Sequence, residues 1–168
     1  MKLFECFRDL GYVDQSYSYF VKFIKSELKT GKVDSFFANK YDVNWGGTSQ
    51  NHEEEIYVIK DNKFWIFSFQ GTKASSKYFY LKDVESLEKE LIFNEEHFSC
   101  IGKLHHFVSE EYKFDKIEIV VHFKNNNERS FYKLKQKVSG EYNKLNSLSD
   151  FYNNIKEKVD SINTNIDD

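Results

Sequence analysis

The residues of this chain that are best suited to bind a metal lie in one short segment, where His97 and Cys100 are followed by His105 and His106. Zinc in proteins takes three or four nitrogen or sulfur ligands that converge in a tetrahedron. If the segment is a single strand, His97 and His105 share one face, while Cys100 and His106 point the other way. We therefore expect ordinary strand residues here, with no bound metal or other cofactor.

The sequence also carries no arrangement of catalytic residues with a recognisable mechanism. A nucleophilic cysteine or serine needs a base within hydrogen-bond reach and a third group that orients this base. Cys6 falls in a predicted apolar helix, and Cys100 on a predicted strand. Asp61-Asn62-Lys63 and Asp83-Val84-Glu85 are better explained by a hairpin turn and a helix cap than by a metal-dependent nuclease. We expect that the protein is not an enzyme.

One candidate binding surface is the basic face of a strand predicted near residues 129–138. Alternation along this strand puts one aromatic ring and several cations on a single face, formed by Arg129, Phe131, Lys133, Lys135 and Lys137. Such a face could follow a phosphate backbone and stack a base. Lysines on an edge strand also prevent aggregation. We favour this second explanation, because no other basic strand accompanies the first.

A second candidate surface combines acidic segments with aromatic side chains. We expect it to bind a basic protein, because acidic groups steer a cationic partner and aromatic rings supply contact area. A solvated surface is the simpler explanation of such acidic runs. The residues assigned to this partner contact are Trp45, Glu53, Glu54, Glu55, Glu110, Glu111 and Asp115.

The composition limits the class of protein. The chain has 168 residues, of which 40% are hydrophobic and 30% charged, so it is long enough for one domain with a sizeable core. No run approaches the roughly 18 apolar residues that a membrane span needs. The N-terminal residues include acids where a signal peptide would be apolar, so we expect a cytoplasmic protein. The net charge of −3 and the presence of two arginines against 22 lysines disfavour nucleic acid as the partner.

Two segments of the sequence repeat one plan, and this repeat predicts the fold. Glu55–Lys60 is followed by turn residues and an apolar run, and 63 residues later Glu118–Phe123 is followed by asparagines and a second aromatic run. We predict an α+β fold with antiparallel sheets, in which each unit has the order β-β-β-α. The single domain over 1–168 would consist of N-terminal helices in 1–31, a first unit in 55–92 and a second unit in 97–162.

Strands and turns follow from the local pattern. Asp61-Asn62 is a two-residue hairpin signal. Phe64–Phe67 is apolar on both faces, which suits a central strand that is covered on both sides. The predicted strand over 116–124 places four apolar residues on one face, namely Ile117, Ile119, Val121 and Phe123.

Three helices are predicted from apolar stripes that begin at a capping residue. Asp14 or Ser16 begins the first, which extends to Lys29. The second is Asp83–Ile92, where Val84, Leu87 and Leu91 fall at helical spacing. Ser147 caps the third, a C-terminal amphipathic helix over Ser147–Ile162. We expect these helices to cover faces or ends of the sheet.

The overall character of the chain, which is small, acidic, aromatic-rich and without catalytic motifs, resembles that of immunity proteins of bacterial contact-dependent growth inhibition systems. Those proteins block the nuclease domain of a cognate toxin. The resemblance covers the whole chain and implies a cytoplasmic inhibitor that occludes the active or substrate-binding face of a toxin. It leaves the oligomeric state open. The alternatives are a single-stranded nucleic-acid-binding protein and a phage-encoded inhibitor of a host defence system.

The predicted order of elements, three strands and a helix repeated twice, is also similar to that of Whirly single-stranded-DNA-binding proteins. The signature Lys-Gly-Lys-Ala-Ala-Leu of that family is missing from this sequence. A shared architecture would not by itself imply a shared function.

Overall fold

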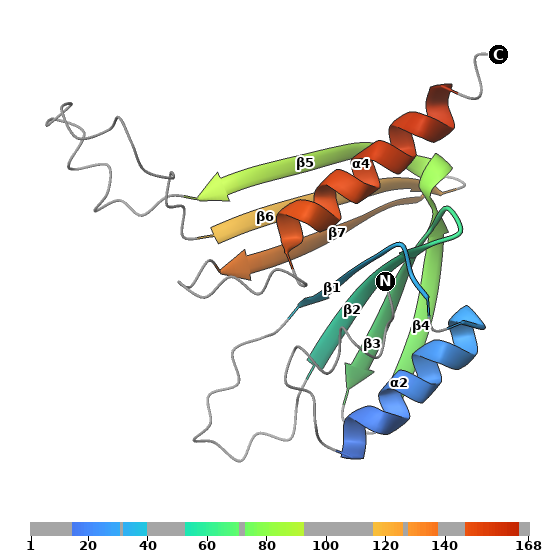
Figure 1. The fold of residues 1–168 in the computed structure, drawn as a ribbon. Helices are drawn as coiled ribbons and strands as arrows, with labels where there is room; N and C mark the ends of the chain where they lie inside the picture. The colour runs from blue at the N-terminus through green and yellow to red at the C-terminus, as the bar shows by residue number, and fades with distance from the viewer. Residues whose placement is uncertain are drawn as a thin grey trace, which may run out of the picture.

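The computed structural model describes residues 15–30, 32–39, 53–70, 73–92, 116–125, 128–137 and 147–164. Within these ranges the fold is α+β, with two antiparallel sheets in the orders β1-β2-β3-β4 and β5-β6-β7 (Figure 1). The elements are α2 (Gln15–Leu28), β1 (Ser35–Asn39), β2 (Glu53–Lys60), β3 (Lys63–Gln70), β4 (Lys73–Tyr80), the 3-10 turn η1 (Leu81–Asp83), β5 (Val84–Ile92), β6 (Lys116–Asn125), β7 (Glu128–Lys137) and α4 (Leu148–Thr164).

The hairpin between β2 and β3 has the predicted two-residue turn. Lys60 pairs with Lys63, and Asp61 and Asn62 between them have φ values of 50° and 57°. Positive φ at both turn residues is the requirement of a type I′ turn, which asparagine and aspartate tolerate better than most residues. The turn sets the register of the β2–β3 pair and therefore decides which residues of β3 face each side of the sheet.

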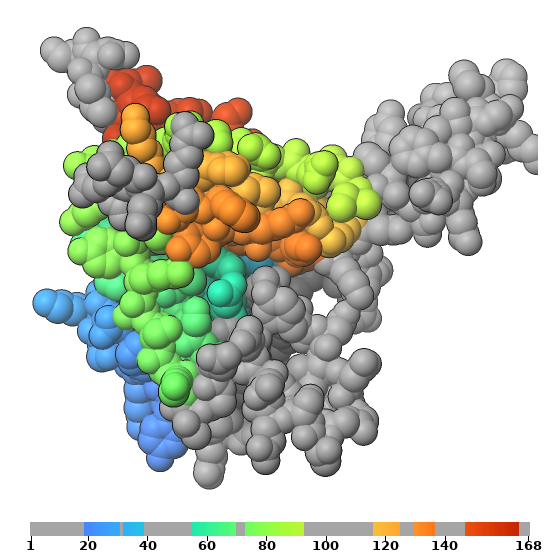
Figure 2. Space-filling view, turned by 180° about the vertical axis from the view of Figure 1, so that it is seen from behind, coloured from blue at the N-terminus to red at the C-terminus, as the bar shows by residue number. Residues whose placement is uncertain are grey.

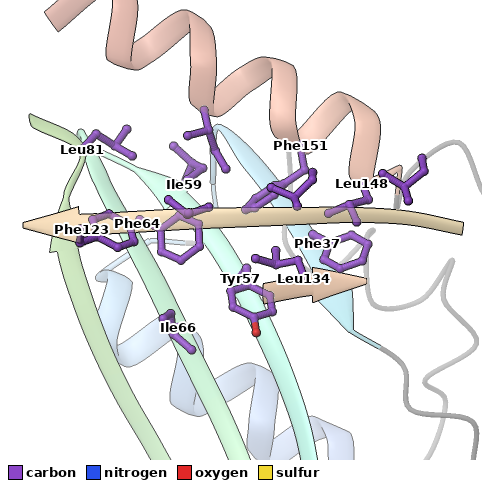
Figure 3. Packing of buried hydrophobic residues seen from close by; sticks show 14 residues of the cluster. Phe37, Tyr57, Ile59, Phe64, Ile66, Leu81, Phe123, Leu134, Leu148 and Phe151 are labelled. Carbon is purple, nitrogen blue, oxygen red and sulfur yellow. The ribbon is translucent and has the colours of Figure 1, made fainter. Parts of the chain in front are cut away.

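Strand β3 is covered on both sides, as its doubly apolar sequence predicts. Phe67 belongs to the core cluster that α2 forms with one face of the four-stranded sheet. Phe64 points to the other face, where its ring centroid lies 5.4 Å from that of Phe123 on β6 and 6.1 Å from that of Phe151 on α4 (Figure 3). The two sheets and α4 thus share a core, while α2 closes the opposite face of the larger sheet (Figure 1).

The alternating pattern of β6 and the cap of α4 are also confirmed. The four apolar residues predicted to share a face of β6 are each exposed by 1% or less, and they are Ile117, Ile119, Val121 and Phe123. Ser147 precedes α4, and its Oγ accepts a hydrogen bond from the Asp150 amide at 3.3 Å. Helix α2 lies where the first helix is predicted.

The helix predicted over Asp83–Ile92 is wrong, because Val84–Ile92 is strand β5 and pairs with β6. An irregularity in the register between Val84 and Ser86 explains the misleading pattern. A bulge inserts one residue, so that Val84 and Leu87, three positions apart, both pack against the core. This spacing imitates a helix. The first unit therefore lacks its predicted helix, and the order of elements on which the Whirly similarity rests is not observed.

Other predicted elements lie outside the described residues. They are the helix expected near residues 3–10 and the strand expected near residues 98–105.

Candidate interaction surface on strands β3 and β4

The acidic surface predicted from the sequence is described only in part. Trp45, Glu110, Glu111 and Asp115 lie outside the described residues, as do His97, Cys100, His105 and His106. Glu53 and Glu54 begin β2. The side chain of Glu55 is half-buried and accepts a hydrogen bond from the hydroxyl of Tyr57, a residue that is 1% exposed. The Glu55 carboxylate is therefore already engaged by a residue of its own strand. The acidic surface as a whole stays a prediction.

The predicted basic face belongs to β7, which lies with β6 at the surface on the side opposite to α4 (Figure 2). Arg129, Phe131, Lys133, Lys135 and Lys137 occupy alternate positions of this strand. Phe131 is 65% exposed. The neighbouring strand, however, contributes an acid to the same face, since Glu118 of β6 is paired in register with Lys135.

Glu118 changes the electrostatics of this face. It forms ion pairs with Lys116 and Lys133, and its carboxylate lies 3.6 Å from Lys135 Nζ. Burial of this side chain would raise its pKa, but hydrogen bonds and charge attraction from Lys116 and Lys133 hold the pKa at about 2. The hydrogen bond to Glu118 in turn raises the pKa of Lys133. Lys133 and Lys135 thus lie beside a carboxylate that is ionised at neutral pH, which weakens this face as a binding surface for phosphates.

A different surface concentrates exposed aromatic rings, and we call it the aromatic–lysine cluster. Its members are Lys63 and Trp65 of β3, Tyr78 and Tyr80 of β4, and Lys82 of η1. The register pairs Trp65 with Tyr78 and Lys63 with Tyr80. Tyr78 and Tyr80 are 42% and 43% exposed.

Ring and cation contacts hold the cluster in one arrangement. The ring centroid of Tyr78 lies 4.7 Å from that of Trp65 and 5.5 Å from that of Tyr80. Lys63 Nζ lies 4.3 Å from the Tyr78 ring centroid and 5.5 Å from that of Tyr80. Lys82 Nζ lies 5.5 Å from the ring centroid of Tyr80. Each cation–π contact is of the kind that stabilises by about 0.5–1 kcal/mol at an exposed site.

The end of α2 explains why these rings remain exposed. Phe23 of α2 contacts Phe67, and one turn later Glu27 accepts a hydrogen bond from Ser76 Oγ at 2.7 Å. The helix ends at Leu28, before it can reach the next residues of β3 and β4 on the same face, where the cluster lies. The cluster therefore continues the packed face of the sheet. Trp65 is half-buried against the core beneath α2, whereas Tyr78 and Tyr80 beyond it are exposed.

The residues of this cluster can be identified in the sequence, but only the pairing of β3 with β4 shows that they share one face. The two-residue turn determines which residues of β3 share a face. When β4 is paired with β3 in the observed register, Trp65, Tyr78 and Tyr80 lie on the same face.

In the described ranges no group of three or more histidine, cysteine, aspartate or glutamate side chains is placed to hold a metal ion. No described helix is both long and apolar enough to cross a membrane. A comparison with protein-family models finds no match, and a comparison with curated proteins finds none either.

Proposed function

We propose that this protein is a protein-binding inhibitor of the immunity type, which neutralises a cognate bacterial toxin by occluding its active or substrate-binding face. The observation that carries the proposal is the aromatic–lysine cluster, where Tyr78 and Tyr80 are exposed yet fixed by neighbouring rings and Lys63. Tyrosine and tryptophan dominate the binding energy of many protein interfaces. Rings that are already ordered lose little conformational entropy on binding.

The charge of the cluster indicates what it would contact. Lys63 and Lys82 are its charged members, so the complementary surface on the partner is acidic. The carboxylates that hold the metal ions of a nuclease form one such surface. A lysine and two tyrosines inserted there would exclude both the metal and the substrate. This contact is distinct from the predicted acidic segments, which would meet a basic part of the same partner.

Single-stranded nucleic acid is the second candidate ligand, because exposed rings beside lysines can also stack bases and bind phosphates. Two observations disfavour it. The chain has a net charge of −3, and Glu118 compensates Lys133 and Lys135 on the predicted basic face of β7. We therefore treat nucleic-acid binding as an outcome of the following test.

The test uses the C-terminal domain encoded by the reading frame that neighbours this gene. We expect its expression to arrest growth and co-expression of this protein to restore it. The double variant Tyr78→Ala/Tyr80→Ala should bind the purified domain roughly 100-fold more weakly or worse, since exposed, ordered tyrosines often act as hot spots. The matched control is Tyr19→Ala, which removes a tyrosine of α2 that is 73% exposed and also has a lysine, Lys22, over its ring.

Three results would contradict the proposal. The first is a neighbouring domain that does not arrest growth or is not neutralised. The second is a double variant that protects as well as the wild type. The third is salt-dependent binding of single-stranded oligothymidine that is lost in the double variant, which would favour the nucleic-acid function.

A further inference from the structure

We infer that the partner docks by adding an extended acidic segment as a new strand to the free edge of β4. This inference rests on the proposed function, and it specifies how the inhibitor would hold its partner. Strand addition combines main-chain hydrogen bonds, which supply affinity, with alternating side-chain contacts, which supply specificity.

Strand β4 is an edge strand with an accessible edge. It pairs with β3 on one side, and no strand of the described ranges pairs with its other side. Six of its eight residues are exposed and none is buried. Figure 2 shows part of β4, in green, at the surface below β7.

A hydrogen bond at the end of β4 shows which of its amides point to the free edge. The Leu81 amide, directly after the strand, donates to the Asn62 carbonyl oxygen at 2.9 Å and therefore points towards β3. Amides alternate in direction along an antiparallel strand. The amides of Tyr80, Tyr78 and Ser76 consequently point away from β3, towards the position that an added strand would occupy.

The side chains of β4 specify the chemistry of that strand. Lys73 and Lys77 lie at alternate positions on one face, and Tyr78 and Tyr80 lie on the other. The strand Lys73-Ala74-Ser75-Ser76-Lys77-Tyr78-Phe79-Tyr80 contains no acid. A complementary strand would place acidic residues beside the lysines and apolar residues beside the tyrosines. We thus expect a segment in which acidic and apolar residues alternate.

The same lysines disfavour a second copy of β4 as the occupant, because two such edges would bring like charges together. Strand β5, in contrast, contains Glu88 and Glu90, which could pair with the lysines of β4. Association of β4 with β5 of a second copy is therefore the outcome against which the inference must be tested.

The first experiment tests the edge itself, without any toxin. A synthetic octapeptide of alternating glutamate and valine is titrated into the 15N-labelled protein, and the same peptide with lysine in place of glutamate serves as the control. We expect the Ser76 and Tyr78 amide signals to shift and to exchange more slowly with solvent. The glutamate peptide should bind at least roughly tenfold more tightly at low salt, with a smaller difference at high salt.

Equal affinity for the two peptides, or shifts confined to other elements, would overturn the inference. A concentration-dependent dimer of the free protein, seen by light scattering and lost on introducing Lys77→Glu, would overturn it in favour of a second copy.

The second experiment blocks the edge and leaves the cluster intact. Ser76→Pro removes an amide that points away from β3, and proline is tolerated at such positions of edge strands. Ser76→Ala is the matched control, because it also removes the hydrogen bond to Glu27. We expect both variants to keep a similar unfolding temperature, but only Ser76→Pro to lose binding of the toxin domain.

The two proposals fail in different ways. If Ser76→Pro binds the domain as well as Ser76→Ala does, strand addition is wrong while the inhibitor function stands. If the wild type does not neutralise the domain, the proposed function is wrong, and the peptide titration still decides whether the edge binds acidic strands.

Discussion

The clearest prediction concerns Glu118 and the pH dependence of stability. The pKa of its carboxyl is about 2 in the folded chain, against 4.5 as its ordinary value. A pKa lowered by folding stabilises the fold above the ordinary value, and this contribution is lost as the pH falls from about 5 towards 2. The shift corresponds to at most about 3 kcal/mol. Because Lys133 and Lys135 are 42% and 48% exposed, solvent screening reduces this to about 1–2 kcal/mol.

The assay is urea unfolding of the wild type and Glu118→Gln between pH 7 and pH 3. At neutral pH the variant should be less stable by about 1–2 kcal/mol, and less than about half of this difference should remain near pH 3. Glu88→Gln is the control, because the Glu88 side chain is 65% exposed and its carboxylate lies 3.1 Å from His122 Nε2. A difference between the wild type and Glu118→Gln that is the same at both pH values would refute this reasoning.

Three further predictions concern the fold. Phe64→Ala empties a fully buried position between Phe123 and Phe151 and should lower the free energy of unfolding by about 3–5 kcal/mol in urea titrations; a loss below about 1 kcal/mol would mean that this core is not packed as described. Ser147→Ala removes the cap of α4 and should lower stability by about 1 kcal/mol, whereas Ser147→Asp should restore most of it; equal stability of the two variants would argue against the cap. Asn62→Gly should stabilise the β2–β3 hairpin slightly, since φ is 57° there, while Asn62→Val should destabilise it; a thermal midpoint that is unchanged in both would contradict a type I′ turn.

Much of the fold was predictable because local and tertiary preferences agree. Asp61-Asn62 favours a type I′ turn whatever surrounds it, and the apolar stripe of α4 starts at a serine that can cap it. In β6, Ile117, Ile119, Val121 and Phe123 alternate along the chain because the face that they share is buried in the core. In each case one segment of sequence contains both the pattern and its cause.

Strand β5 was not predictable in this way, because its apolar residues fit two structures. Val84, Leu87 and Leu91 are three and four positions apart, as on a helix, but a bulge produces the same spacing on a strand. Pairing with β6 decides between them, and this pairing is a tertiary contact.

The properties of the candidate sites depend even more on how the strands are paired. The sequence of β7 alone predicts a basic face around Lys133 and Lys135, whereas the pairing with β6 adds Glu118 to that face. Tyr78 becomes part of a cluster only when Trp65 lies opposite it. Periodicity within one strand predicts which residues share a face, but the neighbours across the sheet determine the charge and the shape of that face.

Hydrogen exchange of the backbone amides, measured with and without the neighbouring toxin domain, tests the central claim most directly. Binding through the aromatic–lysine cluster predicts slower exchange in β3 and β4, and strand addition to β4 predicts the largest change at Ser76, Tyr78 and Tyr80. Protection that is confined to β7, or to elements other than β3 and β4, would contradict the claim.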